Sequence, residues 1–345
     1  MAAISDLGGW PAILETLASS RDITSEQAQA ALGAILAGRA SDAQVAAFAV
    51  MLRLKGPTAN ELLGLATAMR QAATPLDIPE EALDIVGTGG TSNRRAHALN
   101  VSTMACFVAA GAGATVCKHG SVKASSTSGS FDLLAALGVP VGAAVEQVAE
   151  TVRSHGLGFA FAKTFHPAMR HVAPVRSQVG ISTVFNLLGP LSHPGRVKRQ
   201  VLGVLDESLA PVMAEVLQAL GSVRSLVVHG DGQFDEFTTT GANQVWELND
   251  DAITQYTVQP GDVGLRSAEP QQLRGGAASD NVRILTDVLA GEGGPYRDIV
   301  VFNAAAALYA AGIAADLPAG VAAAAAALDD GRAAAKLRAV TAPPP

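Results

Sequence analysis

The chain has 345 residues, of which 49% are hydrophobic, 16% are charged and only 4% are aromatic. This length suits about two domains, and the hydrophobic content excludes a globally disordered protein. The net charge of −7 argues against a general binder of nucleic acids or anionic membranes, because either partner would require a basic face.

Helices are predicted for residues 1–77, which we expect to form a separate helical domain. Three segments fit capping boxes, in which a hydroxyl side chain and a Glu or Gln three residues later satisfy free N–H groups of a first helical turn. These segments are Thr24–Gln27, Ser41–Gln44 and Thr58–Glu61. The stretch TPLDIPEE, residues 74–81, contains two prolines and is the expected linker.

From residue 78 to residue 345, short apolar runs alternate with helical patterns. The expected strands are residues 82–86, 114–118, 158–162, 199–205, 224–230 and 243–248, and the expected helices are residues 101–110, 131–137, 211–220, 281–289 and 298–310. This alternation predicts an α/β domain with a mostly parallel central sheet. We expect a helical segment near residues 166–182 to pack on the N-terminal domain, and the alanine-rich stretch after Pro318 to form a surface helix.

A glycine-rich loop, with Gly87, Gly89 and Gly90, follows the first expected strand. Glycines there let backbone N–H groups approach an anion without obstruction by a Cβ atom. The loop lacks the Gly-Lys-Ser/Thr of a P-loop and the third glycine of a dinucleotide fingerprint. For any one of these glycines, a tight turn without a ligand is the alternative.

The charge pattern around this loop favours a phosphate or pyrophosphate site. No Asp or Glu occurs between Asp84 and Asp132. The basic residues of this stretch are Arg94, Arg95, Lys118 and Lys123. The stretch is also rich in hydroxyl groups, which bind phosphate oxygens. Asn100 is the expected N-cap of a helix beginning at Val101, whose positive end would point to the same place.

An acidic pair, Asp235 and Glu236, stands in a glycine-containing loop after the expected strand 224–230. Adjacent acids usually form a solvated turn. At the C-terminal end of a buried strand, beside a pyrophosphate site, they would be suitable oxygen ligands for Mg²⁺.

Seven short motifs occur in order along the chain. They are Gly87–Gly90, Asn100–Thr103, Lys118–Gly120, Ser128–Ser130, His166–Met169, Ala173–Arg176 and Asp235–Glu236. Together they resemble the anthranilate phosphoribosyltransferase family, over nearly the whole chain. The resemblance implies a helical domain joined to an α/β domain of the nucleoside phosphorylase/phosphoribosyltransferase type, a site at the hinge between them, and a homodimer formed through the helical domain.

The resemblance implies transfer of phosphoribosyl from 5-phosphoribosyl 1-pyrophosphate (PRPP) to the amine of anthranilate, a step of tryptophan biosynthesis. The donor would be bound by Gly87, Thr88, Gly90, Thr91, Asn100, Val101, Ser102, Thr103, Lys118, His119, Gly120, Ser125, Ser126 and Ser130. The acceptor would be bound by Gly87, Ser121, Lys163, His166 and Arg176. Two Mg²⁺ ions would be held by Ser102 on one side and by Asp235 and Glu236 on the other. No general base is implied, because the aryl amine is already neutral.

Departures from the family pattern gather around the substrate pockets. The family has Asp, Thr, Asn, Arg, Lys and Pro or Gln where this chain has Thr91, Ala98, Ser121, Val122, Thr127 and Lys163. The loop before Asn100 is also three residues longer. These changes indicate either compensation, with Arg94, Arg95 and Lys123 replacing lost charges, or a different aromatic acid as acceptor.

Two further alternatives stay open from the sequence. A nucleoside phosphorylase is disfavoured by Arg176 and the His-Pro-Ala-Met motif. A non-enzymatic protein that binds phosphates or nucleic acid is disfavoured by the pI of about 5.5 and by Asp235–Glu236.

The two cysteines, Cys106 and Cys117, lie in apolar segments and are expected to be buried and reduced. The first residues lack the basic and apolar segments of a signal peptide, and the longest apolar runs are too short to span a bilayer. We therefore expect a cytoplasmic protein with no membrane or nucleic-acid partner.

Overall fold

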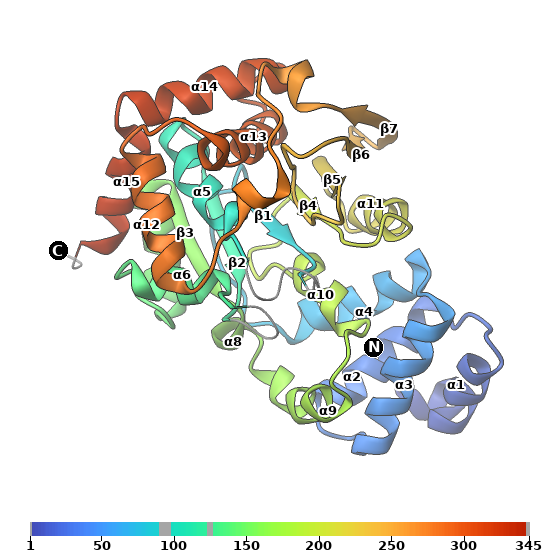
Figure 1. Cartoon of the computed structure of the whole chain (residues 1–345). Helices are drawn as coiled ribbons and strands as arrows, with labels where there is room; N and C mark the ends of the chain where they lie inside the picture. Colours follow the sequence, from blue (N-terminus) through green and yellow to red (C-terminus); the bar gives the residue numbers. More distant parts are fainter. Residues whose placement is uncertain (1, 90–97, 123–126, 343–345) are drawn as a thin grey trace.

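A helical region at one end of the molecule joins a larger α/β body (Figure 1). The computed structural model describes residues 2–89, 98–122 and 127–342. The N-terminus lies in the helical region, and the chain ends on the far side of the α/β body. Within the described residues, no helix is both long and apolar enough to cross a membrane.

The helical region begins with a 3₁₀ turn, η1 (Ile4–Leu7), and continues with α1 (Gly9–Ala18), α2 (Ser25–Leu36), α3 (Asp42–Lys55) and α4 (Ala59–Ala72). All three predicted capping boxes are confirmed, because the side chains of Thr24, Ser41 and Thr58 each accept from the N–H three residues later. Gly56 ends α3 with a φ of 83°, which a residue with a side chain rarely adopts.

The central sheet, as described, has seven strands in the order β3-β2-β1-β4-β5-β6-β7. The strands are β1 (Leu83–Gly87), β2 (Val116–Gly120), β3 (Leu157–Phe161), β4 (Arg199–Gly203), β5 (Arg224–Gly230), β6 (Asn243–Asn249) and β7 (Ala252–Val258). The strands from β3 to β5 in this order are parallel, β6 runs antiparallel to β5, and β7 runs antiparallel to β6. The predicted strands and the mostly parallel sheet are confirmed, and β7 was missed.

Strand β7 forms a tight hairpin with β6. Asn249 pairs with Ala252, and the two residues between them, Asp250 and Asp251, have φ values of 45° and 65°. Two positive φ angles are the mark of a type I′ turn, whose twist suits a two-residue hairpin. The side chains of β7 are mostly exposed, as expected at the edge of a sheet.

Helices cover both faces of the sheet (Figure 1). One face is covered by α5 (Val101–Gly111), α6 (Ser130–Ala136), α12 (Ala278–Leu289) and α13 (Pro295–Ala310). The other is covered by α10 (Phe185–Leu191) and α11 (Leu209–Ala219), beyond which lies α4, and by α7 (Val145–His155), which packs on Cys117 and Ala160 of β2 and β3. Successive side chains of β5 point to opposite faces of the sheet. Leu226 and Val228 are therefore buried in the core on the first face, and Val227 is buried in the core on the second.

The helix predicted after Pro318 is present as α14 (Leu317–Asp329), and a second helix, α15 (Arg332–Thr341), follows it. One side of α14 is exposed, and the other packs along α13. A Cβ atom on Gly320 would lie 2.7 Å from the carbonyl oxygen of Ala305, so the two backbones meet closely. The small alanine side chains of α14 allow this close packing against α13.

Between β3 and β4 the chain leaves the sheet and lies against the helical region. This stretch contains α8 (Ala162–Phe165), η3 (Pro167–His171) and α9 (Ala173–Val179). Helix α9 contacts α3, η3 contacts α2, and Val172 and Val175 are buried in the core shared with those helices. The division of the chain between residues 77 and 78 stays a prediction.

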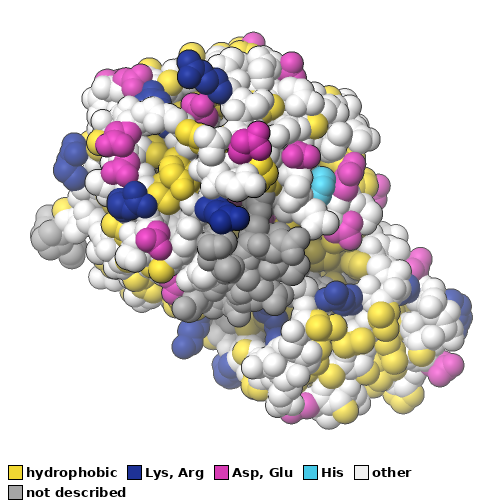
Figure 2. Space-filling model, in the orientation of Figure 1, with side chains coloured by type: hydrophobic (Ala, Val, Ile, Leu, Met, Phe, Trp, Pro, Cys, Tyr) yellow, Lys and Arg dark blue, Asp and Glu magenta, His cyan; other side chains and the backbone are white. Residues whose placement is uncertain are grey.

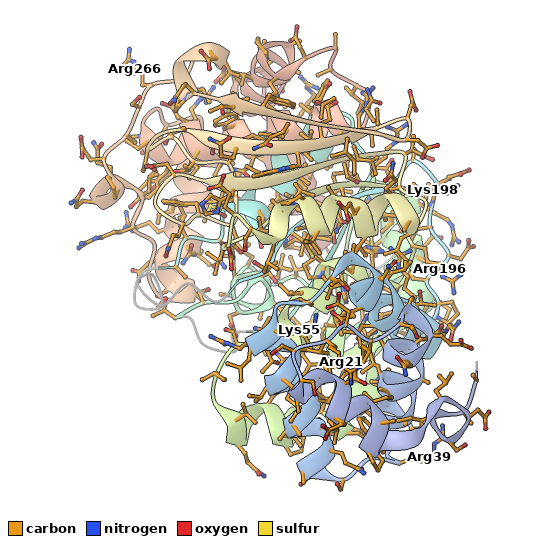
Figure 3. All side chains as sticks on the ribbon, turned by 90° about the vertical axis from the view of Figure 1, so that its right-hand side faces the viewer. Arg21, Arg39, Lys55, Arg196, Lys198 and Arg266 are labelled. Atoms are coloured by element: carbon orange, nitrogen blue, oxygen red, sulfur yellow. The ribbon has the colours of Figure 1, made fainter. Side chains whose placement is uncertain are left out.

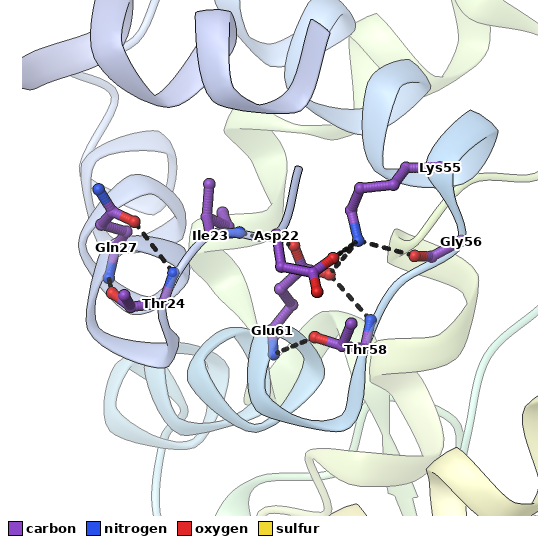
Figure 4. Close-up of polar contacts among 8 residues, drawn as sticks. All are labelled: Asp22, Ile23, Thr24, Gln27, Lys55, Gly56, Thr58 and Glu61. Atoms are coloured by element: carbon purple, nitrogen blue, oxygen red, sulfur yellow. Dashed lines mark hydrogen bonds and ion pairs between the residues drawn. The ribbon is translucent and has the colours of Figure 1, made fainter. Parts of the chain in front are cut away.

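A buried ion pair ties the helical region together (Figure 4). The carboxylate of Glu61, fully buried, accepts from the N–H groups of Ile23 (3.0 Å) and Thr58 (2.8 Å). The ammonium of Lys55 lies 2.8 Å from Glu61 Oε2 and 2.7 Å from Asp22 Oδ1. Burial lowers the pKa of Lys55, but the hydrogen bonds and negative charges of Asp22 and Glu61 outweigh it, and the net pKa is raised.

We predict that Lys55→Met lowers the free energy of unfolding by about 3 kcal/mol, because the Glu61 carboxylate would stay buried without its counter-charge. Lys198→Met is the matched control, since Lys198 pairs with Glu80 where both side chains are largely exposed. Figure 3 shows Lys55 among the helices and Lys198 at the molecular edge. Urea unfolding measures both, and equal losses in the two variants would contradict the prediction.

Candidate functional site

A cleft of about 1130 Å³ lies where the C-terminal ends of β1 and β2 face α8, η3 and α9. In sheets with parallel strands, this edge is the usual place for a ligand. Most residues predicted for the donor, the acceptor and the metal line this one cleft: Gly87, Thr88, Asn100, Ser102, Thr103, Lys118, His119, Gly120, Ser121, Ser130, Lys163, His166, Arg176, Asp235 and Glu236.

Several predicted site residues are not among these lining residues. The side chain of Val101 is fully buried in the core on α5, so only its backbone could face a ligand. Gly90, Thr91, Ser125 and Ser126 lie outside the described residues, as do Arg94, Arg95 and Lys123.

The acidic loop reaches the glycine-rich loop directly. The N–H of Gly89 donates to Asp235 Oδ2 at 2.7 Å. A Cβ atom on Gly87 would lie 2.3 Å from the same oxygen, and one on Gly203 would lie 1.6 Å from the carbonyl oxygen of Asp235. Glycine at position 87 therefore makes room for the acidic loop, a requirement that the sequence did not reveal.

Lys118 is buried, and its ammonium is aimed at the start of α5. It donates to the carbonyl oxygen of Ile85 and, at 3.1 Å, to Ser102 Oγ. The carboxylate of Asp84, beneath it in β1, accepts from the N–H of His119 at 3.1 Å. Burial raises the pKa of Asp84 to about 7, against the opposing effects of Lys118 and the His119 N–H.

Asn100 stands at the N-cap of α5, but its side chain makes no capping bond, so this part of the prediction is wrong. Its Oδ1 accepts from Ser128 Oγ at 2.8 Å, and its Nδ2 donates to the Ser128 carbonyl at 3.3 Å. The amide is thus used to join two motifs that are 28 residues apart.

Three histidines meet beneath the cleft. The ring of His119 lies 5.0 Å from that of His166 and 5.7 Å from that of His193, centroid to centroid. Burial lowers the pKa of His119 and brings the pKa values of His166 and His193 to about 4. All three rings are therefore neutral near pH 7. The Nε2 atoms of His119 and His166 are buried without a partner among the described residues, and both residues line the cleft.

Sequence reasoning assigned no role to His193, the third member of this cluster, whose two ring nitrogens both have backbone partners. Its Nε2 lies 2.8 Å from the carbonyl oxygen of Cys117, and its Nδ1 accepts from the N–H of Gly195 at 3.0 Å. Both cysteines are free and buried, as predicted.

Three cations of the described chain, Lys163, Arg170 and Arg176, line the cleft where the acceptor is predicted to bind, and Arg170 was not predicted. Arg176 is partly buried, and this burial lowers its pKa. Other lining residues that were not predicted include Met69, Met169, Phe185, Asn186 and Arg274. A sequence signal existed for Met169, which ends the His166–Met169 motif, and for Phe185 and Asn186, because the segment TVFNLLGPL also matches the family pattern.

Metal ligands on the protein are few. Within the described ranges, no group of three or more His, Cys, Asp and Glu side chains could hold an ion by itself. Magnesium commonly binds one or two carboxylates and completes its shell with substrate phosphates and water, so Asp235 and Glu236 fit such an ion.

Two family models match the chain. The glycosyl transferase family helical bundle domain matches residues 11–73, and the glycosyl transferase family a/b domain matches residues 79–334. Among curated proteins, the anthranilate phosphoribosyltransferase of Chloroflexus aggregans is 47% identical over 93% of this chain and 94% of its own length. The chain belongs to the anthranilate phosphoribosyltransferase family. It is accordingly a pentosyltransferase.

Solved structures of anthranilate phosphoribosyltransferases have the same fold. The enzyme of Thermus thermophilus superposes with a TM-score of 0.89 at 42% identity, covering 95% of this chain and 98% of that one. The Saccharomyces cerevisiae enzyme in complex with PRPP and Mg gives 0.87 at 28% identity, with 96% of both chains covered. The same yeast enzyme has also been solved in complex with 4-fluoroanthranilate.

We predict that the buried histidines make stability depend on pH. The pKa of His193 falls from 6.5 to about 4 on burial, so between these values the unfolded chain binds more protons than the folded one. Stability should be full above pH ~6.5 and decline towards pH ~4, by up to about 1.4 kcal/mol per pH unit for one histidine. His193→Asn should flatten this decline in urea unfolding. A variant with the parental pH slope would contradict the prediction.

Proposed function

We propose that the cleft at the C-terminal ends of β1 and β2 is where the chain transfers phosphoribosyl from PRPP to the amine of anthranilate, releasing pyrophosphate. This is the reaction of its family and belongs to tryptophan biosynthesis. The observation that carries the assignment is the convergence of donor, acceptor and acidic motifs on one cleft, although they are spread from Gly87 to Glu236.

The donor would lie against β1, β2 and the start of α5. Backbone N–H groups at the glycine loop, the hydroxyls of Ser102 and Thr103, and the ammonium of Lys118 suit a pyrophosphate. The hydroxyl of Thr103 is fully buried with no partner among the described residues, yet Thr103 lines the cleft. A phosphate oxygen would satisfy it. From the sequence resemblance, Gly90, Thr91, Ser125 and Ser126 complete this set.

Magnesium would be held by Asp235 and Glu236 on one side and by Ser102 on the other, and we propose two ions. Bound Mg²⁺ neutralises charge on pyrophosphate as the leaving group departs. The N–H of Gly89 fixes the Asp235 carboxylate, which keeps one oxygen in place. The ammonium of Lys118 also lines the cleft and would face the pyrophosphate.

The acceptor would lie between β2 and α9. Arg176 offers a planar pair of donors that matches the anthranilate carboxylate. The neutral rings of His119 and His166 can donate or accept a hydrogen bond without competing for that carboxylate as cations. Because ribose carries developing positive charge at C1′, the amine needs only to be held in line with the leaving group. This geometry asks for orientation rather than for a strong base.

A second candidate is transfer to a different or additional aromatic acid. Lys163 and Arg170 line the acceptor side and are exposed, so two extra cations stand near Arg176. They favour an acceptor with more than one acidic group. Ser121, where the family has Asn, leaves the pocket wider.

We also propose a homodimer joined through the helical region. Figure 2 shows hydrophobic side chains gathered on this part of the surface. In α3, Val50 and Met51 are partly exposed and Leu54 is 79% exposed, although the opposite face of the helix is fully buried. Ile181, just after the neighbouring α9, is 50% exposed. Large exposed apolar groups of this kind mark a protein interface. A cytoplasmic location is proposed from the two reduced cysteines.

Activity is predicted to require the acidic pair. Asp235→Asn with Glu236→Gln should lower kcat by at least about two orders of magnitude, the scale of one lost electrostatic stabiliser. Asp250→Asn with Asp251→Asn is the matched control, because these adjacent acids lie in the β6–β7 turn. Steady-state rates at saturating PRPP and Mg²⁺ measure both. Undiminished turnover in the first double variant, or full activity in EDTA, would exclude the metal-assisted reaction.

Ser121 is predicted to set acceptor selectivity. Ser121→Asn should raise kcat/KM for anthranilate and lower it for ring-substituted analogues, because a restored amide adds a hydrogen-bonding group worth about 1–3 kcal/mol of discrimination. Ser154→Asn, an exposed change on α7, is the control. If the parent already exceeds roughly 10⁴ M⁻¹s⁻¹ with anthranilate and rejects the analogues, the altered-acceptor hypothesis is wrong.

A further inference from the structure

The segment that leads from the glycine-rich loop into α5 is held by a buried asparagine of α12. Asn281 is fully buried, its Nδ2 donates to the carbonyl oxygen of Ala98 at 3.0 Å, and its Oδ1 accepts from the N–H of Asn100 at 2.9 Å. One side chain therefore satisfies the two backbone groups on either side of Leu99. An amide side chain offers a donor and an acceptor side by side, which matches this pair of backbone groups without a charge.

The same segment is held from the other side by the serine-rich stretch that follows β2. The N–H of Ala98 donates to Thr127 Oγ1 at 3.3 Å, and the Asn100 amide pairs with Ser128 through its Oδ1 and its Nδ2. Residues 98–100 are thus held by hydrogen bonds from α12 on one side and from residues 127–128 on the other. We call this arrangement the Asn281 latch.

The backbone around the latch leaves little freedom. A Cβ atom on Gly275 would lie 2.1 Å from the Ala98 carbonyl oxygen, and the N–H of Gly276 donates to that oxygen at 3.2 Å. The loop before α12 therefore presses directly on Ala98. Ser102 and Thr103, which line the cleft, stand only two and three residues after Asn100.

We infer that Asn281 and Thr127 are positioning residues for the donor: neither lines the cleft, and together they fix where α5 begins. The inference rests on the proposed donor site. Fixing Ala98 and Asn100 sets the direction of the first turn of α5, and so the placement of the hydroxyls of Ser102 and Thr103. Groups that are fixed before the donor binds lower the entropic cost of binding, so loosening them weakens the affinity.

Asn281 and Thr127 both contact Ala98, but only Thr127 stands at a position where the chain departs from the family pattern. Asn281 reaches Ala98 from a helix on the sheet face, and Ala98 itself is another position of departure. The hydroxyl of Thr127 accepts a backbone N–H that a lysine at this position would leave without an acceptor. This contact belongs to the lengthened loop of this chain.

The test is the affinity for PRPP in Mg²⁺, measured by isothermal titration calorimetry on the full chain. Asn281→Ala should raise the Kd for PRPP roughly tenfold, and Thr127→Val should raise it severalfold, the scale of lost hydrogen bonds to the backbone. The KM for anthranilate should stay close to the parental value in both. Val288→Ala is the control, because it removes buried volume from the same helix without touching the latch.

The outcomes separate positioning from general destabilisation. Val288→Ala should lower the unfolding midpoint and keep the parental Kd for PRPP. A folded Thr127→Val with the parental Kd, or an Asn281→Ala whose Kd changes no more than that of Val288→Ala, overturns the inference. If Asn281→Ala does not fold, the isosteric Thr127→Val decides alone. A parent that fails to bind PRPP overturns the donor site itself and the latch with it, whereas equal binding by parent and variants overturns the latch only.

Discussion

The cleft depends on one steric constraint, the close approach of the acidic loop to the ends of β1 and β4. Neither Gly87 nor Gly203 can carry a side chain, because a Cβ atom would lie 2.3 Å and 1.6 Å, respectively, from oxygens of Asp235. The strand order β1-β4-β5 makes this approach possible, since the carboxyl ends of parallel strands share one edge. Groups 146 residues apart, the Gly89 N–H and the Asp235 carboxylate, thereby face the same space.

Irregular segments around the cleft are held by buried amide side chains. Asn303 accepts from the N–H of Phe237 at 3.1 Å and donates to its carbonyl at 2.7 Å. Asn243 does the same for Thr238, at 2.7 Å and 3.0 Å. With Asn281, these residues pair with backbone groups that helices and strands leave unsatisfied. A neutral amide achieves this without burying a charge next to the proposed site for phosphates and metal.

The sequence predicted the capping boxes and the buried strands, which carry their own local signals. It missed the edge strand β7, which is polar, and α8, whose four residues are too few to form a helix alone. In the site, the residues within motifs were predicted to lie together. Met69 and His193 come from segments without a motif, so only the fold could bring them there. Asn100 shows the same limit of sequence-based prediction. Its side chain was expected to cap α5 but instead bonds to Ser128, which is distant in the sequence.

The departures from the family pattern are not independent of one another. Ala98 and Thr127 are two of them, and they are in contact: the N–H of one donates to the hydroxyl of the other. A contact between two substituted positions supports compensation, since a longer loop needs a new anchor where it rejoins α5. Lys163 shows no such pairing with a substituted position among the described residues; it is exposed on α8 and lines the cleft on the side proposed for the acceptor. The substitutions near the proposed donor site are therefore consistent with the same donor, PRPP. A change of substrate would concern the acceptor, on the side of the cleft that Lys163 lines.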